Sequence, residues 1–167
     1  MMDSILPAEL VAAARRAVEA NAAIGRRVTI AESCTGGLVA AALTEIPGSS
    51  DVIDAAFVTY SNDAKLDLLN VSSDLLETFG AVSIAVAWSM AQGALSRTGA
   101  DVAVAITGVA GPGGGSVKKP VGTVVFARAV KGGDPADVHA DRKDFGDLGR
   151  GGVRLQAALC ALDLLLP

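Results

Sequence analysis

Aromatic side chains and cationic charge are both scarce in this sequence. Only 4% of its 167 residues are aromatic, and 14 lysines and arginines face 18 aspartates and glutamates, for a net charge of −4. Such a chain lacks the cationic field that the phosphates of a nucleic acid require. It also offers few platforms on which the bases of a single strand could stack. We therefore expect no nucleic-acid partner.

Cysteine and histidine are nearly absent as well. Cys34 and Cys160 lie far apart, with the single histidine, His139, between them. This spacing matches neither a zinc site nor a disulfide framework, and free thiols favour a reducing compartment. Met1-Met2-Asp3 begins no basic segment followed by an apolar run, and no apolar stretch approaches the roughly 20 residues of a membrane span. The sequence predicts a cytoplasmic protein without a zinc site or a membrane partner.

Hydrophobic residues, in contrast, are abundant. They make up 51% of the chain, a fraction that excludes disorder. A chain of this length buries about 70% of its unfolded surface without help from disulfides. We expect a single domain over residues 1–167, with a core built mostly from alanine, valine, leucine and isoleucine.

Helical and extended patterns alternate along the chain. We predict strands over residues 27–32, 54–60, 101–107, 123–130 and 137–145. The predicted helices begin near Pro7, Thr35, Asn62, Ser73, Ser83 and Asp147; Gly99 ends the fifth, and Leu155, Leu159, Leu162 and Leu166 form the buried face of the last. This order indicates an α/β fold, a three-layer α/β/α domain whose mostly parallel central sheet carries one antiparallel hairpin.

Polar residues follow the first three predicted strands. Ser33, Tyr60 and Thr107 each stand where a strand ends. Ligands of parallel sheets bind beyond the carboxyl ends of the strands, so we expect these three residues to meet at one edge and to mark the site.

Ser33 lies in Glu32-Ser33-Cys34-Thr35-Gly36-Gly37, between a strand and a helix. Backbone N–H groups at such a turn can stabilise an oxyanion or hold an anionic group. The alternative is a serine that caps the helix, followed by glycines that allow close packing. The segment lacks the G-x-S-x-G pattern, so it predicts no catalytic triad.

A serine nucleophile needs a base. His139, on a predicted hairpin strand, fits better as an exposed partner of a neighbouring aspartate. Lys65, one turn into the helix after the second strand, could serve if burial lowers its pKa, with Tyr60 relaying the proton. The alternative for Lys65 is a solvated charge beside Asp63. Cys34 is a rival nucleophile, and the alternative for it is a small packed residue beside the site.

A glycine-rich segment follows Thr107, from Gly108 to Gly122. It matches neither the P-loop nor the dinucleotide-binding fingerprint. Its backbone amides still suit an anionic group, although it could equally be a mobile surface loop. Arg150 and Arg154 lie one helical turn apart, and either could reach a phosphate or a carboxylate. The alternative for both is a surface ion pair.

Six ordered segments resemble the CinA C-terminal family, whose enzymes are nicotinamide-nucleotide amidohydrolases. They are Ala-Glu-Ser-Cys-Thr-Gly-Gly at 31–37, Pro-Gly-Ser-Ser at 47–50, Val-Thr-Tyr-Ser-Asn-x-x-Lys at 58–65, Gly-Ala-Val-Ser at 80–83, Ala-Ile-Thr-Gly-x-Ala-Gly-Pro-Gly-Gly-Gly at 105–115 and Lys-Pro-Val-Gly-Thr-Val at 119–124. The resemblance covers nearly the whole chain. Two departures are Ile84, where the family usually has an acidic residue, and the terminal motif, whose register leaves the substrate-binding arginine open.

The resemblance implies hydrolysis of nicotinamide mononucleotide to nicotinate mononucleotide and ammonia. Ser33 would be the nucleophile and Lys65 the base, with Tyr60 assisting and Thr107 beside the reacting group. The remaining expected substrate-binding residues are Cys34, Thr35, Gly36, Gly37, Ser50, Gly108, Gly111, Gly113, Gly114 and Arg150. Amides near Thr35 and Gly36 would hold the oxyanion, and this implied chemistry requires no metal and no organic cofactor. The expected partner is a small-molecule nucleotide, a homo-oligomer is left open, and the alternative function is a non-catalytic nucleotide-binding module.

Overall fold

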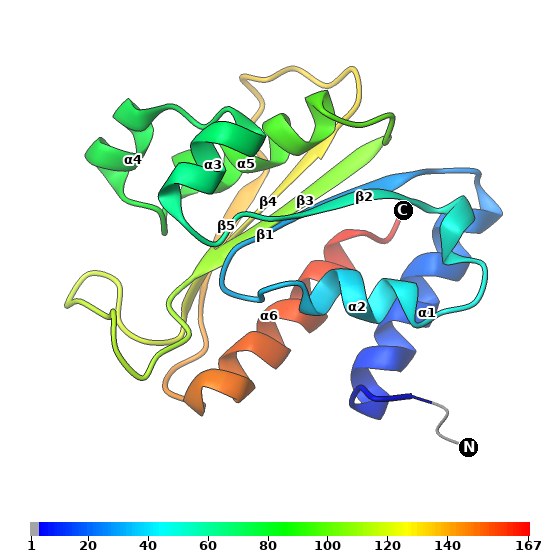
Figure 1. Cartoon of the computed structure of the whole chain (residues 1–167), viewed down its shortest axis with the longest axis horizontal. Coiled ribbons are helices and arrows are strands. Elements are labelled where there is room, and N and C mark those ends of the chain that lie inside the picture. The colour runs from blue at the N-terminus through cyan, green and yellow to red at the C-terminus, as the bar shows by residue number, and fades with distance from the viewer. Residues whose placement is uncertain (1–3) are drawn as a thin grey trace.

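A mixed sheet lies between two layers of helices in the computed structural model, which describes residues 4–167 (Figure 1). Within these residues the strands are β1 (Val28–Glu32), β2 (Ile53–Val58), β3 (Val102–Gly108), β4 (Thr123–Val130) and β5 (Ala140–Asp144). Their order across the sheet is β2-β1-β3-β4-β5. β1 pairs in parallel with β2 and with β3, whereas β4 pairs antiparallel with β3 and with β5. The predicted three-layer α/β architecture is thus confirmed, hairpin included.

The helices divide evenly between the two faces of the sheet (Figure 1). One face is covered by α1 (Ala8–Ala23), α2 (Leu38–Thr44) and α6 (Gly149–Leu164). The other carries α3 (Asn62–Leu69), α4 (Ser73–Phe79) and α5 (Ile84–Ser96). Serine side chains cap the last three helices: Ser61, Ser72 and Ser83 each accept a hydrogen bond from a backbone N–H in the first turn.

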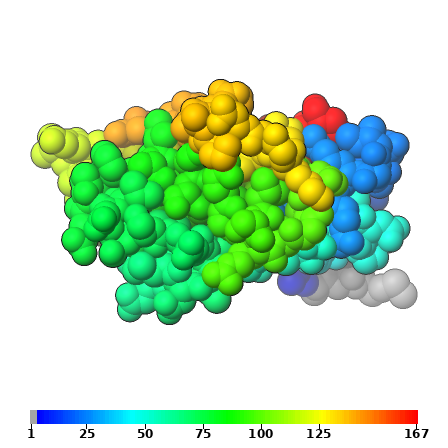
Figure 2. Space-filling model, turned by 90° about the horizontal axis from the view of Figure 1, so that it is seen from above, coloured from blue at the N-terminus to red at the C-terminus, as the bar shows by residue number. Residues whose placement is uncertain are grey.

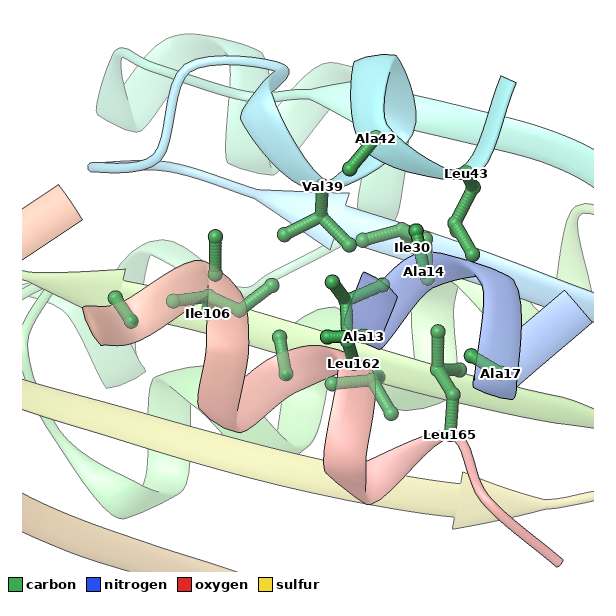
Figure 3. Packing of buried hydrophobic residues seen from close by; sticks show 14 of the residues in the cluster. Ala13, Ala14, Ala17, Ile30, Val39, Ala42, Leu43, Ile106, Leu162 and Leu165 are labelled. Atoms are coloured by element: carbon green, nitrogen blue, oxygen red, sulfur yellow. The ribbon is translucent and has the colours of Figure 1, made fainter. Parts of the chain in front are cut away.

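Alternation along the central strands builds two cores. Ile30 and Ile106 face α1, α2 and α6, where they pack with Leu162 (Figure 3). Ala31 and Ala105 face α5 and lie in the core that contains Met90. Because both faces of β1 and β3 are covered, these strands are buried along almost their whole length.

Close helix contact on the second face depends on a glycine of α5. A Cβ atom built at Gly93 would lie 2.0 Å from the carbonyl oxygen of Leu69, which is the last residue of α3. No side chain fits there without separating the two helices. Gly93 therefore sets the distance between α5 and the end of α3.

Two helix boundaries differ from the sequence predictions. α2 begins at Leu38 instead of Thr35, because Gly36 and Gly37 adopt positive φ angles of 60° and 95° and keep the preceding residues in a turn. α5 ends at Ser96 with Arg97 as its C-cap, so Gly99 lies beyond the helix end.

The buried face of α6 also differs. It consists of Val153, Ala157, Ala158, Ala161 and Leu162. Of the four leucines predicted to form that face only Leu162 is buried; Leu155 and Leu159 pack at its margin. Small residues lie against the sheet because α6 also contacts α1 and α2, which leaves little room for longer side chains.

Within residues 4–167, no helix is both long enough and apolar enough to cross a membrane. The expected lack of a signal peptide depends on Met1-Met2-Asp3, which lies outside the described residues.

Candidate active site

The carboxyl ends of β1, β2 and β3 meet at one edge of the sheet, where they border a cavity of about 300 Å³. Ser33, Tyr60 and Thr107 all line it, as the strand order predicts. Lys65, Cys34 and Arg150 line it too, together with four glycines of the segment after β3: Gly108, Gly111, Gly113 and Gly114. Most of the predicted site residues therefore share one cavity.

Lys65 and Ser33 are in direct contact in this cavity. The Lys65 Nζ atom lies 3.0 Å from Ser33 Oγ, and it donates to the carbonyl oxygens of Thr59 at 2.8 Å and Ser61 at 3.5 Å. The Lys65 side chain is buried, with only 1% of its surface exposed. Within residues 4–167, no carboxylate pairs with the amine, so the alternative of a solvated charge beside Asp63 is wrong.

Burial lowers the pKa of the Lys65 amine below its ordinary value, and a charge on Cys34 would oppose that shift. A neutral amine has two N–H groups and one lone pair. In the structure Lys65 Nζ is the donor to Ser33 Oγ and to the carbonyls of Thr59 and Ser61. When the amine is neutral, its two N–H groups can stay with the two carbonyls, and its lone pair is then free to accept a hydrogen bond from the Ser33 hydroxyl. The geometry therefore suits a lysine that takes a proton from serine.

Cys34 is a weak rival as nucleophile. Burial raises the pKa of its thiol to about 11, and the nearby Glu32 carboxylate adds to that rise. A thiol that stays protonated near neutral pH attacks poorly, since the thiolate is the nucleophile. The sulfur is also tightly packed, 3.1 Å from where a Cβ atom of Gly108 would lie. Cys34 is therefore a packed residue in the cavity wall.

The turn after Ser33 uses many of its own polar groups. The Ser33 N–H donates to Ile106 of β3, and the Gly36 N–H donates back to the Ser33 carbonyl at 3.0 Å. The expected oxyanion donor at Gly36 is therefore already engaged, which corrects the prediction. In the described part of the chain, the N–H groups of Cys34 and Thr35 have no backbone acceptor, although the Cys34 N–H lies against its own sulfur. They are the amides nearest to Ser33 in sequence.

Thr35, Gly36 and Gly37 do not line the cavity, contrary to prediction. The Thr35 side chain is fully buried with its hydroxyl unpaired, and its carbonyl accepts a hydrogen bond from Arg154 Nη2 at 3.0 Å. A Cβ atom at Gly36 would meet the same Arg154, and one at Gly37 would meet Val58. These residues shape the turn behind the cavity.

Arg150 bridges three walls of the cavity from the start of α6. Its Nη1 atom donates to the carbonyl of Gly111 at 2.8 Å, and its Nη2 atom donates to the Tyr60 hydroxyl at 2.7 Å. Of the two candidate arginines, Arg150 lines the cavity, whereas Arg154 holds the turn at Thr35. Because Lys65 already contacts Ser33, no relay through Tyr60 is needed between them.

Ser50 lies far from this edge, contrary to prediction. It belongs to a short 3₁₀ helix, Ser49–Asp51, that precedes β2. The cavity lies beyond the opposite, carboxyl end of that strand. Six strand residues span roughly 20 Å, so Ser50 cannot reach the cavity of its own chain.

Sequence reasoning gave no site role to five further lining residues: Asn62, Ala81, Val82, Val109 and Ala110. The Ala81 carbonyl accepts a hydrogen bond from the buried Thr107 hydroxyl at 2.9 Å, which joins the end of β3 to the segment before α5. The resemblance includes Ala81 and Val82 in its Gly-Ala-Val-Ser segment, which was the available signal. Ile84, the departure from the family pattern, is outside the lining.

The glycine-rich segment projects at one end of the molecule (yellow-green at the left of Figure 2). Despite its composition it is held in place: Lys119 Nζ donates to the Phe79 carbonyl at 2.6 Å, and Arg142 Nη1 donates to the Lys118 carbonyl at 3.0 Å. Lys119 is therefore committed to the end of α4. Among the residues that line the cavity, the cationic side chains are Lys65 and Arg150.

A second cavity, of about 400 Å³, lies beside β4 and β5 and includes Arg128, His139 and Leu164 in its lining. His139 is exposed and lies 3.1 Å from Asp137, as the sequence predicts. Within residues 4–167, no three metal-ligating side chains gather into a cluster.

Comparison with known proteins connects this arrangement to a family. The model of the CinA C-terminal domain matches residues 11–167. The chain belongs to the CinA C-terminal domain family. Its fold is close to the crystal structure of competence/damage inducible protein CihA from Agrobacterium tumefaciens, with a TM-score of 0.92 and 50% identity over 97% of this chain and 96% of that one.

Relatives of two lengths carry this domain. The nicotinamide-nucleotide amidohydrolase PncC of Enterobacter agglomerans is 53% identical over 152 residues, which cover 89% of this chain and 90% of that protein. A CinA-like protein of Mycobacterium avium is 60% identical over 106 residues, which cover 64% of this chain but only 24% of its own length. The chain thus matches one short relative almost end to end and spans about a quarter of a longer one.

Proposed function

We propose that this chain hydrolyses the carboxamide of nicotinamide mononucleotide, giving nicotinate mononucleotide and ammonia. The observation that carries the proposal is the buried contact between Ser33 and Lys65, at 3.0 Å, inside the cavity at the carboxyl ends of the strands. The substrate class comes from the similarity to a relative named as a nicotinamide-nucleotide amidohydrolase. A buried nucleophile–base pair supports an enzyme over a module that only binds a nucleotide, because binding alone needs no such pair.

In the proposed reaction, Ser33 Oγ bonds to the carboxamide carbon while its proton passes to Lys65 Nζ. The tetrahedral intermediate collapses, the C–N bond breaks, and Lys65 gives that proton to the departing nitrogen, which leaves as ammonia. Water then attacks the ester carbon and gives a proton to Lys65. Nicotinate mononucleotide is released, and the proton returns to Ser33.

The oxyanion of each intermediate needs hydrogen-bond donors that are already in place. The amides of Cys34 and Thr35 meet this requirement: they follow the nucleophile directly, and no backbone acceptor of the described chain occupies them. Gly36 is excluded by its hydrogen bond to Ser33, and the first turn of α2 is excluded because Glu32 accepts its N–H groups.

Arg150 is the proposed partner of the substrate phosphate. Its guanidinium lines the cavity and donates to two neutral acceptors, the Tyr60 hydroxyl and the Gly111 carbonyl. A phosphate is a stronger acceptor than either of them, so it can take the place of one of these hydrogen bonds. Backbone amides of the glycine-rich segment would add donors, and Gly113 and Gly114 stand at the exposed side of the cavity.

The deciding experiment measures ammonia and nicotinate mononucleotide released from nicotinamide mononucleotide by the purified chain. Ser33→Ala is the matched control, since it removes one oxygen atom and leaves the cavity walls in place. Release of both products in equal amounts by the wild type, and none by the variant, supports the proposal. Tight binding of the nucleotide without any release would favour the non-catalytic module instead.

A further inference from the structure

Glu32 is a fully buried carboxylate directly before the proposed nucleophile, and the reaction leaves it without a chemical task. Its Oε1 atom accepts a hydrogen bond from the N–H of Val39, and its Oε2 atom accepts one from the N–H of Ala40, both at 3.0 Å. These N–H groups belong to the first turn of α2. The carboxylate therefore caps a helix that starts six residues after it.

This cap compensates for a local weakness of α2. The residue at the N-cap position, Gly37, has no side chain to accept the free N–H groups of the first turn. The left-handed conformation of Gly37 is what turns the chain into the helix, so a capping side chain at that position would be strained. Glu32 supplies the missing acceptors from the end of β1, where a buried carboxylate is stable only because both oxygen atoms are hydrogen-bonded.

The side chains of Glu32 and Ser33 leave the chain on opposite sides of the sheet. Glu32 reaches α2, on the face covered by α1, α2 and α6, whereas Ser33 reaches Lys65 of α3 on the other face. Consecutive residues of an extended chain alternate in this way. The backbone that carries Ser33 is thus fixed on one side by Glu32 and on the other by the contact of Ser33 with Lys65.

We propose that Glu32 is a positioning residue, which sets the place of Ser33 Oγ and of the Cys34 and Thr35 amides by fastening the 33–37 turn to α2. This inference rests on the proposed function, because it assumes that Ser33 is the nucleophile. Both the attacking atom and the oxyanion donors lie on that turn. A small displacement of the turn therefore weakens attack without removing any group that binds the substrate.

The test compares Glu32→Gln with Ser72→Ala. Glutamine keeps the size of the side chain, but its amide nitrogen carries hydrogens and cannot accept a hydrogen bond. It can therefore accept from only one of the two N–H groups of Val39 and Ala40. Ser72→Ala removes the ordinary serine cap of α4, away from the cavity, and serves as a control for lost stability alone. Melting temperature, kcat, KM and the rate at which a fluorophosphonate probe labels Ser33 are measured for each.

We expect Glu32→Gln to lower kcat about tenfold to a hundredfold at nearly unchanged KM, with an equal slowing of Ser33 labelling, as misplacement of reacting atoms does. Ser72→Ala should lower the melting temperature and leave kcat and labelling unchanged. Wild-type kcat and labelling in folded Glu32→Gln would overturn the proposal, and so would equal losses of kcat in the two variants.

Two further results keep the outcome clear. If Glu32→Gln does not fold, Glu32→Asp replaces it: aspartate keeps the charge but is one methylene too short to reach both amides, so it should slow labelling, and wild-type labelling in this variant would overturn the inference. If the wild type labels at Ser33 but releases no ammonia, the proposed substrate is wrong. The labelling rates of the two variants still decide the role of Glu32.

Discussion

Two cavities of the described chain differ more in the residues that line them than in volume. The one beside β4 and β5 is larger, at about 400 against about 300 Å³, but its histidine is exposed and paired with an exposed aspartate. The smaller one holds Ser33 in contact with a lysine that is 1% exposed. Burying a polar group costs free energy, so this pair points to function where volume alone does not.

The strongest test of this comparison is removal of the nucleophile. Ser33→Ala should lower kcat at least about 10³-fold, since loss of an attacking atom removes the covalent route altogether. Binding of nicotinamide mononucleotide, measured by calorimetry, should persist because the rest of the cavity is unchanged. Near-normal turnover by this variant would transfer the role of nucleophile to Cys34 or to water.

Lys65→Arg should have the next largest effect. Arginine keeps a positive charge but does not lose its proton in proteins, so it cannot act as a base. We expect kcat to fall more than about tenfold, a barrier increase above about 1.4 kcal/mol. In the wild type, kcat/KM should rise with pH as Lys65 loses its proton, at a pKa below the ordinary value, and the variant should lack this rise.

The lowered pKa of Lys65 also predicts how stability depends on pH. The unfolded chain binds the lysine proton up to a pH of about 10.4, whereas the folded chain releases it at lower pH. Between these two values the unfolded state carries more protons, so the free energy of unfolding should rise with pH. Urea denaturation of Lys65→Met across this range should show a flatter dependence; equal slopes would mean that the pKa is not lowered.

A smaller effect should separate the two arginines of α6. Arg150→Met should raise KM for nicotinamide mononucleotide about tenfold, as loss of one charge-assisted contact does, and should not affect the riboside that lacks the phosphate. Arg154→Met is the matched control one turn away. It frees the Thr35 carbonyl and should lower kcat while KM stays the same. A common response of both variants would contradict separate roles.

The smallest effects on kcat should come from two residues to which the comparison of the cavities gives no catalytic role. His139→Ala, beside the larger cavity, and Cys34→Ala, in the site wall, should each keep kcat within about threefold of the wild type. Steady-state kinetics with equal amounts of folded protein measures both. A large loss in His139→Ala would give the second cavity a catalytic role and would reverse the comparison.

Much of the fold follows from local pattern. The buried strand at 101–107 and the serine caps at Ser61, Ser72 and Ser83 are visible in sequence, because apolar runs and capping side chains act within a few residues. The start of α2 was not predictable in the same way. Gly36 and Gly37 could open a helix or delay one, and only their positive φ angles decide between the two.

Site residues could be predicted where the order of the strands determines their position. They could not be predicted where their position depends on contacts between residues distant in sequence. Parallel strands bring the residues after β1, β2 and β3 together, so Ser33, Tyr60 and Thr107 could be placed at one edge. Ser50 was misplaced because a shared motif gives no position in space. The cap that Glu32 provides depends on how closely α2 packs against the end of β1, a relation that sequence spacing does not encode.

Gly93 gives the molecule a constraint of another kind. It touches neither Ser33 nor Lys65, yet it fixes where the end of α3 lies, and Leu69 at that end is one helical turn from Lys65. Any larger residue there must move the end of α3 away from α5, and this displacement would lengthen the contact between Ser33 and Lys65 on which the proposed proton transfer depends. Gly93 lies outside the cavity lining, yet it limits how this sequence can vary while the distance between Ser33 and Lys65 is kept.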